Sequence, residues 1–290
     1  MSESSKTIGA IDAWGSWIPP EGAKRWPASF HHAFRNYKSD PRIFTGMSLE
    51  EMIDDMDQAG VDRVILSSFE YEGVQVVSNA QVAEAVRKYP KRFVGCGTVD
   101  PRGKPMKVLD EIKRMVEEQN MICLRLEPYA YGDGTVGTPP NAKMYWPLYV
   151  KCVELDIAVS VQVGHTGPLL PSEAGRPIYL DEVALAFPEL RIIGAHLGQP
   201  WHEEMMILAW KHPNVYIETS ARVPKHWPES FVKFCDTYGQ DKALWATDYP
   251  LLPFKRCIDE IDDLNIRFES KKKLLRDNAI RAFKLEDKIQ

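Results

Sequence analysis

Short apolar runs alternate with longer amphipathic segments along most of the chain. The runs are rich in apolar and β-branched residues, a composition that predicts strands. They lie at residues 8–14, 61–66, 93–98, 122–126, 157–163, 190–195, 215–219 and 243–247. The segments between them place apolar residues at helical spacing, which predicts helices near residues 75–89, 105–119, 143–155, 180–187, 201–211, 228–238, 254–264 and 270–283.

One further helix start is marked directly in the sequence. Ser48 and Glu51 form the Ser-x-x-Glu pattern of a capping box, in which each side chain binds the backbone N–H of the other residue. Gly60 is expected to end this helix. The apolar residues that recur on one of its faces are Leu49, Met52, Ile53 and Met56.

The first strand brings the number of strand–helix units to eight, the number in a (β/α)₈ barrel. We therefore predict an α/β fold, a TIM barrel formed as a single domain over residues 1–290. A doubly wound sheet is the alternative, but no glycine-rich phosphate-binding turn follows the first strand. Residues 15–47 are too long for a simple connection, and their aromatic content predicts a packed, lid-like loop after strand one rather than a disordered insertion.

Chemically active side chains follow several predicted strands closely. Barrel enzymes carry their active sites at the carboxyl ends of the strands, and this position selects His165, His196 and Asp248 after strands five, six and eight. We expect the three side chains to converge on one cavity, where they act as acids and bases or as metal ligands. Arg125 and Glu127 follow strand four, where they bind substrate or pair with each other.

The strand-end residues belong to four short motifs, His165-Thr166-Gly167, Ala195-His196-Leu197-Gly198, Glu218-Thr219-Ser220 and Thr247-Asp248-Tyr249-Pro250. In this order they resemble the motifs of the amidohydrolase-related family. The branch concerned contains aminocarboxymuconate-semialdehyde decarboxylase, the resorcylate-type decarboxylases and pyrone-dicarboxylate lactonase. The C-terminal residues Asp277-Asn278-Ala279 and Phe283 resemble the closing helix of the family, so the resemblance covers about residues 8–285.

The resemblance implies a role for each strand-end residue. His165 would be the metal ligand of strand five, His196 a catalytic or ligand histidine, and Asp248 a carboxylate that binds metal and shuttles a proton. The match fails at strand one, where the family usually has Asp-x-His-x-His or Glu-x-His. Here Trp14 and Ser16 occupy the two ligand positions. An indole cannot coordinate a cation, and a neutral hydroxyl is a poor ligand.

This departure shapes the expectations for cofactor and substrate. We expect no cofactor or one weakly held divalent metal, zinc or manganese, bound by His165 and Asp248. Trp14, Ser16, Arg125 and Glu127 are expected to contact the substrate, with the indole stacking on an unsaturated ring and the guanidinium clamping a carboxylate. The side chains that could replace the missing metal ligands are Glu127, Glu70 and His31 or His32.

Composition excludes several classes of partner. The net charge of −5 comes from 36 basic and 41 acidic residues scattered over 290 positions, without the basic clustering that nucleic-acid binding requires. The five cysteines form no CxxC pair and are expected to be reduced core residues. With no signal peptide or membrane-spanning run, we expect a cytoplasmic protein that acts on a small molecule without a membrane partner. Assembly into a homo-oligomer stays open.

Three functions fit these residues. The leading hypothesis is hydrolysis of a small cyclic or aromatic-derived lactone, ester or amide, without metal or with a weakly bound one. Asp248 would be the general base, His165 and His196 would polarise the carbonyl, and Arg125 would anchor a carboxylate. The first alternative is a metal-dependent decarboxylase or hydratase of an aromatic or muconate-like acid. The second is a non-catalytic binding protein on the same barrel.

Overall fold

The computed structural model describes residues 4–71, 73–132 and 137–288. Within them, one parallel sheet has the strand order β1-β2-β5-β6-β7-β8-β9-β10. Its strands are β1 (Ala10–Gly15), β2 (Val61–Ser67), β5 (Phe93–Thr98), β6 (Met121–Leu126), β7 (Ala158–Gln162), β8 (Ile192–Ala195), β9 (Val215–Glu218) and β10 (Ala243–Leu244). Each corresponds to a predicted strand, but β10 has two residues where residues 243–247 were expected.

The segment after β10 closes the sheet against β1. The backbone N–H of Ala13 donates to the Trp245 carbonyl at 3.0 Å, and that of Asp248 donates to the Trp14 carbonyl at 2.8 Å. A parallel bridge between Gly15 and Tyr249 extends this contact. The last segment therefore pairs with the first strand through fewer bonds than a regular ladder. The predicted TIM barrel is confirmed.

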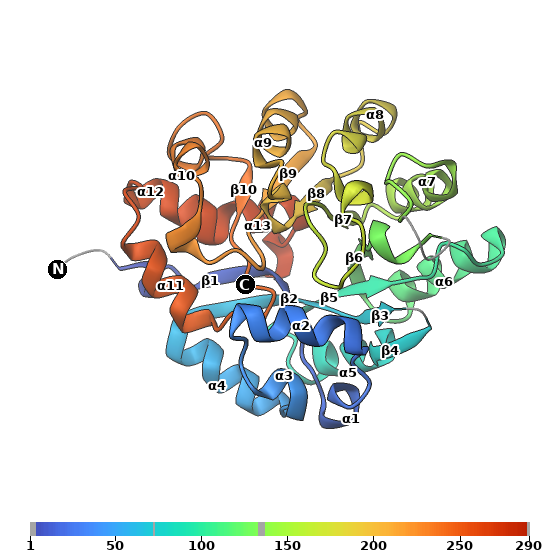
Figure 1. The fold of residues 1–290 in the computed structure, drawn as a ribbon, viewed down its shortest axis with the longest axis horizontal. Coiled ribbons are helices and arrows are strands. Elements are labelled where there is room, and N and C mark those ends of the chain that lie inside the picture. Colours follow the sequence, from blue (N-terminus) through green and yellow to red (C-terminus); the bar gives the residue numbers. More distant parts are fainter. Residues whose placement is uncertain (1–3, 72, 133–136, 289–290) are drawn as a thin grey trace.

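Helices surround the barrel as an outer ring (Figure 1). They are α4 (Leu49–Ala59), α5 (Asn79–Lys88), α6 (Pro105–Glu117), α7 (Trp146–Glu154), α8 (Tyr179–Ala186), α9 (His202–Lys211), α10 (Glu229–Asp236), α11 (Phe254–Asp262) and α12 (Phe268–Lys272), followed by α13 (Asn278–Phe283), whose apolar side chains join the cluster inside the barrel. A π-helical turn, Lys273–Asp277, joins the last two, so the predicted helix over residues 270–283 is not uniform. Short 3₁₀ turns lie at Ser5–Thr7, Pro128–Ala130, Lys143–Tyr145, Glu173–Gly175, His196–Gly198, Pro224–His226 and Glu286–Lys288.

The capping box predicted for α4 is present. The Ser48 hydroxyl accepts from the Glu51 backbone N–H at 3.1 Å, and the Glu51 carboxylate accepts from the Ser48 N–H at 2.7 Å. Gly60 ends the helix with a φ of 75°, a conformation that costs glycine little because it lacks a Cβ atom. Ser78 and Gln81 form a second capping box at the start of α5.

Two parts of the structure differ from the sequence-based expectations. The lid-like segment, residues 15–47, contains three helices, α1 (Pro20–Ala23), α2 (Ala28–Tyr37) and α3 (Arg42–Thr45), of which α2 lies across the end of the barrel (Figure 1). An antiparallel hairpin of β3 (Phe69–Tyr71) and β4 (Val74–Val77) occupies the region where a helix was expected from residue 75. The lid segment and the hairpin meet through Trp26, whose ring lies 5.0 Å from that of Phe69.

The sheet separates two apolar clusters. The inner cluster combines one alternate set of strand side chains, such as Ile11, Ile65 and Ile193, with Ala279 and Phe283 of α13. The larger cluster lies between the strands and the outer helices. The five cysteines are buried and free, in agreement with the expectation of reduced core thiols. Among the described residues, no helix has both the length and the apolar content needed to cross a bilayer.

Candidate active site

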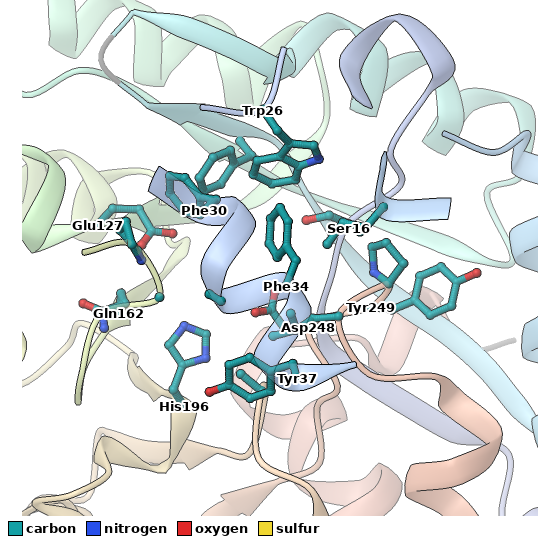
Figure 2. Close-up of a pocket in the computed structure, with 18 of the residues that line it drawn as sticks. Ser16, Trp26, Phe30, Phe34, Tyr37, Glu127, Gln162, His196, Asp248 and Tyr249 are labelled. Carbon is teal, nitrogen blue, oxygen red and sulfur yellow. The ribbon is translucent and has the colours of Figure 1, made fainter. Parts of the chain in front are cut away.

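A cavity opens at the carboxyl ends of the strands, beneath α2. Figure 2 shows its aromatic wall facing Asp248 and His196. The structure brings together most of the predicted site residues, namely Ser16, Arg125, Glu127, His165, His196 and Asp248. Aromatic side chains form much of the remaining lining: Trp26, Phe30, Phe34, Tyr37, Phe69 and Tyr129. The lid-like segment, residues 15–47, therefore contributes directly to the cavity wall.

Trp14 does not line this cavity, contrary to the expectation of an indole stacking on substrate. It packs against two side chains that do. The Arg125 guanidinium carbon lies 4.0 Å from the centroid of the indole ring, and the ring of His196 lies 5.6 Å away. Trp14 thus supports the cavity from behind, in an arrangement that favours the positive charge of Arg125 over the π face.

Asp248 is held by backbone contacts between the first strand and the last. Its φ of 60° is unusual for a non-glycine residue and is fixed by the hydrogen bond from its N–H to the Trp14 carbonyl. Burial raises the pKa of Asp248 to about 6, against the lowering effect of the Arg125 guanidinium. The carboxyl therefore carries a proton over a wider pH range than an exposed aspartate.

His196 is a neutral imidazole with a defined orientation. Its Nδ1 lies 2.6 Å from the Ser220 hydroxyl and 3.3 Å from the Ser220 carbonyl. Because the carbonyl can only accept, we place the ring proton on Nδ1, which leaves the Nε2 lone pair available. The Ser220 hydroxyl in turn donates to Glu218 at 2.6 Å. Burial, followed by the charge of Arg222, lowers the pKa of His196 well below its usual value.

His165 contacts a cation that the sequence analysis missed. Arg222 places Nη2 3.1 Å from Nδ1 of His165 and Nη1 3.4 Å from Nε2. The same guanidinium donates to the Tyr37 hydroxyl at 2.6 Å and to the His196 carbonyl at 3.1 Å. Burial, and then this guanidinium, lowers the pKa of His165. Arg222 follows β9 by four residues, just past the Glu218-Thr219-Ser220 motif, so a wider window after each strand would have selected it.

Arg125 and Glu127 form a buried ion pair rather than a free clamp. The Arg125 Nε donates to the Glu127 carboxylate, and Nη1 donates to the Ser67 hydroxyl at 3.2 Å. The two charged side chains are 5% and 2% exposed, so each neutralises the other in a medium of low polarity. The second carboxylate oxygen of Glu127 is buried without a hydrogen-bond partner, as is the side-chain oxygen of Gln162 in the same cavity. These two oxygens are free to accept from a ligand.

The residues present do not fit the metal site that the resemblance implies. No cluster of three His, Cys, Asp or Glu side chains able to hold an ion exists in residues 4–71, 73–132 and 137–288. At the strand-one positions an indole packs under Arg125, and a neutral hydroxyl stands at Ser16. Arg222 lies against both ring nitrogens of His165, the atoms that an ion would need.

The replacement ligands considered from the sequence do not complete such a site. Glu127 is paired with Arg125, and the Glu70 carboxylate accepts from Gln75 within the hairpin at 2.9 Å. The His31 ring packs on Phe44, and His32 lies 2.9 Å from the Asn36 amide. Neither histidine lines the cavity that contains Asp248.

Comparison with known proteins places these features in a family. The Amidohydrolase family matches residues 11–285. The chain is 24% identical to gamma-resorcylate decarboxylase of Polaromonas sp. (strain JS666 / ATCC BAA-500) over 285 aligned positions, which cover 79% of this chain and 85% of that protein. It is 29% identical to 2-keto-4-carboxy-3-hexenedioate hydratase of Sphingobium sp. (strain NBRC 103272 / SYK-6) over 140 positions, which cover 43% and 41%.

Solved structures share the fold. An uncharacterized TIM-barrel protein from Bordetella bronchiseptica superimposes with a TM-score of 0.82 at 22% identity, covering 94% of this chain and 97% of the other. The 5-carboxyvanillate decarboxylase of Novosphingobium aromaticivorans, complexed with manganese and 4-hydroxy-3-methoxy-5-nitrobenzoic acid, gives 0.73 at 20% identity and covers 98% and 100%. The sequence led us to expect either no cofactor or one divalent metal, and the manganese bound to that decarboxylase is consistent with this expectation.

These comparisons correct the leading functional hypothesis. Hydrolysis of a lactone, ester or amide was expected, but the relatives are decarboxylases and a hydratase, enzymes that break or form bonds by elimination and addition. The hydrolase hypothesis followed from the missing strand-one ligands, but the loss of a metal ligand does not choose between hydrolysis and decarboxylation. The match over residues 11–285, together with the barrel and its strand-end residues, shows that the chain is an enzyme of the Amidohydrolase family.

Proposed function

We propose that the chain is a lyase that removes carbon dioxide from a small aromatic or muconate-like carboxylic acid. One observation carries the proposal: the Asp248 carboxyl and the Arg222 guanidinium line the same cavity, which has aromatic walls. An acid that can donate a proton and a cation that can hold a carboxylate are the two groups that such a reaction requires. The decarboxylases among the relatives support this choice.

The cavity walls favour a flat, unsaturated substrate. Phe30, Phe34 and Tyr37 of α2 face the strand ends, and Phe69 and Tyr129 add further rings. Aromatic side chains hold a planar ligand by stacking and edge contacts while excluding water from the reacting atoms. Exclusion of water strengthens the electrostatic contacts between the ligand and the charged groups of the site.

The proton chemistry is assigned to Asp248 and His196. Asp248 transfers its proton to the carbon that bears the carboxylate, and the carbon–carbon bond then breaks, with its electron pair restoring the unsaturated system as carbon dioxide leaves. Asp248 recovers a proton from water. His196, with Nε2 unprotonated, accepts the proton of a neighbouring hydroxyl group on the substrate, which makes the ring more electron-rich. No step is assigned to a metal, because the residues described at this site do not fit one.

The test is turnover of a panel of acids with the wild type and Asp248→Asn. We use 2,6-dihydroxybenzoate, 5-carboxyvanillate and cis,cis-muconate, and measure carbon dioxide release and, in D₂O, deuterium at the vacated carbon. Asp248→Asn should lower kcat about 100-fold or more, because amide protons are not transferred. Asp263→Asn, an exposed aspartate in the same part of the chain, is the matched control. Full turnover by Asp248→Asn would refute the proton-donor role.

A hydratase is the second candidate, because the match to 2-keto-4-carboxy-3-hexenedioate hydratase extends over 140 positions. The same Asp248 would then donate its proton to an alkene carbon while water adds to the neighbouring carbon. Mass spectrometry of the products separates the reactions, since one removes carbon dioxide and the other adds a water molecule. Addition of water to the muconate-like acid, with no release of carbon dioxide from any acid, would select the hydratase.

A further inference from the structure

Arg222 is a buried cation that forms no direct ion pair with a carboxylate among the residues that the structure describes, and Asp248 and Glu218 act on it only from beyond contact distance. Its side chain lines the cavity, and the residue is 8% exposed. All of its side-chain contacts are with neutral groups: the Tyr37 hydroxyl, the His196 carbonyl and the His165 ring. A buried guanidinium is costly to keep unless a negative charge compensates it, so this position calls for an anion.

Arg125, the other arginine of the cavity, does have a direct carboxylate partner. Arg125 is neutralised by Glu127, which contacts it directly, and its guanidinium rests on the Trp14 ring. A substrate carboxylate approaching Arg125 would meet the Glu127 charge at the same place. Arg222, and not the arginine that the sequence selected, is therefore the guanidinium of the cavity that no carboxylate of the described residues contacts directly.

Arg222 is also held in place before any ligand arrives. Its backbone N–H donates to the Thr219 carbonyl at 3.1 Å, and its carbonyl accepts from the Trp227 indole at 2.9 Å. Its Nε is directed at the His196 carbonyl. The preceding residue, Ala221, has a φ of 57°, a conformation that is rare outside glycine and is found where the fold fixes a functional side chain. A pre-positioned guanidinium loses little freedom on binding an anion.

We propose that Arg222 binds the carboxylate of the substrate, at the place on His165 where the family resemblance puts a divalent metal. This inference rests on the proposed function, because it takes a small carboxylic acid as the substrate. The guanidinium lies within hydrogen-bonding distance of both ring nitrogens of His165, so an ion would have to displace it. A guanidinium supplies paired N–H donors to two carboxylate oxygens. A divalent cation would instead have to enter beside an existing positive charge.

The test is binding of a matched pair of probes to EDTA-treated protein by isothermal titration calorimetry. The probes are 2,6-dihydroxybenzoate and resorcinol, which differ by the carboxylate alone. The variants are Arg222→Met, which keeps much of the side-chain volume, and Arg222→Lys, which keeps the charge but not the paired donors. Arg35→Met, an exposed arginine on α2, is the control.

We expect the wild type to bind 2,6-dihydroxybenzoate at least tenfold more tightly than resorcinol. Arg222→Met should weaken binding of the acid about 100-fold and leave that of resorcinol unchanged, and Arg222→Lys should lie between. Arg35→Met should match the wild type. The inference is overturned if the wild type shows no preference for the acid, or if Arg222→Met retains that preference.

Metal content provides a second readout that does not depend on turnover. Protein incubated with MnCl₂ and then desalted should contain well under one manganese per chain, by inductively coupled plasma mass spectrometry. One tightly held manganese per wild-type chain would overturn the inference, because the ion would occupy the proposed position of the guanidinium.

The inference about Arg222 and the proposed decarboxylation can fail independently. A preference for the acid that requires Arg222, without release of carbon dioxide from any acid, would refute the proposed decarboxylation and leave the inference about Arg222 intact. Release of carbon dioxide by Arg222→Met at the wild-type kcat/KM would support the proposed decarboxylation and refute the role of Arg222 in binding the carboxylate.

Discussion

At the scale of single residues, the cavity is defined by how its charges are paired. Arg125 and Glu127 are both nearly inaccessible and compensate each other, whereas Arg222 has only neutral contacts. Sequence position alone could not show which arginine is paired, since Arg125 lies near the end of β6 and Arg222 lies four residues after β9. The difference arises from the location of the nearest carboxylate in space. Pairing therefore separates a structural arginine from one that is available to a ligand.

The buried pair should matter for stability. Replacing Glu127 with Gln leaves the Arg125 charge in the protein interior without compensation, so the free energy of unfolding should fall by about 3 kcal/mol. Urea denaturation followed by circular dichroism measures this change. Arg125→Met should be similarly destabilising, while the double variant Arg125→Met/Glu127→Leu should lose less than the sum of the single changes. Glu21→Gln, in an exposed pair with Lys24, is the control and should leave the midpoint unchanged. Unchanged stability of Glu127→Gln would contradict the assignment of a compensating pair.

At the scale of elements, strand ends and helix starts divide the tasks of function and stability. His196, Ala221 and Asp248 all have positive φ values within four residues after the end of a strand. Helices begin at this same end of the barrel, and α4 and α5 carry local capping boxes at Ser48 and Ser78. Local capping can be read from four residues of sequence. The turns at the strand ends depend on contacts such as Asp248 N–H to Trp14 carbonyl, between residues far apart in the chain.

The capping box of α4 should contribute to stability but not to activity. Ser48→Ala removes the hydroxyl that accepts from the Glu51 N–H, and should lower the free energy of unfolding by about 1 kcal/mol. Chemical denaturation should show a shifted midpoint with an unchanged slope. Because Ser48 does not line the cavity, kcat and KM should remain those of the wild type. A large loss of kcat would show that α4 influences the site, contrary to this view.

At the scale of the whole molecule, Asp12 joins the first strand to the last. Its carboxylate accepts from the backbone N–H groups of Trp14 at 3.0 Å and Thr247 at 3.1 Å, and from the Thr247 hydroxyl. β10 is short, so these side-chain bonds supplement the few backbone bonds that close the barrel. Burial raises the pKa of Asp12 to about 7, although its hydrogen bonds oppose this shift.

The raised pKa predicts a dependence of stability on pH. Folded Asp12 holds its proton up to a pKa of about 7, whereas the unfolded residue releases it near the ordinary aspartate pKa of 3.8, so raising the pH between these values favours unfolding. From pH 6 to pH 8 the Asp12 contribution should fall by about 1 kcal/mol. Asp12→Asn, which cannot titrate, should show a correspondingly smaller fall in urea denaturation at the two pH values. Equal falls in the two proteins would contradict the raised pKa.

Much of the fold follows from local pattern. All eight barrel strands and most outer helices lie where apolar periodicity predicted them, and Ser48, Glu51 and Gly60 fixed the limits of α4. The exceptions depend on contacts distant in the chain. The β3–β4 hairpin packs on the lid through Phe69 and Trp26, and the helices of residues 15–47 bury their aromatic face on the same cluster, so neither region shows a self-contained period.

The sequence by itself determined that polar side chains would meet at one end of a barrel, because parallel strands bring their carboxyl ends to a common edge. His165, His196 and Asp248 lie in one cavity for this reason. Only the tertiary structure decided which charges are compensated and which are not. Arg125 meets Glu127, Trp14 lies behind the cavity, and Arg222 reaches His165 from a position four residues after β9. The physical reason is that electrostatic energy depends on distance and burial, and both are set by packing among segments far apart in the chain.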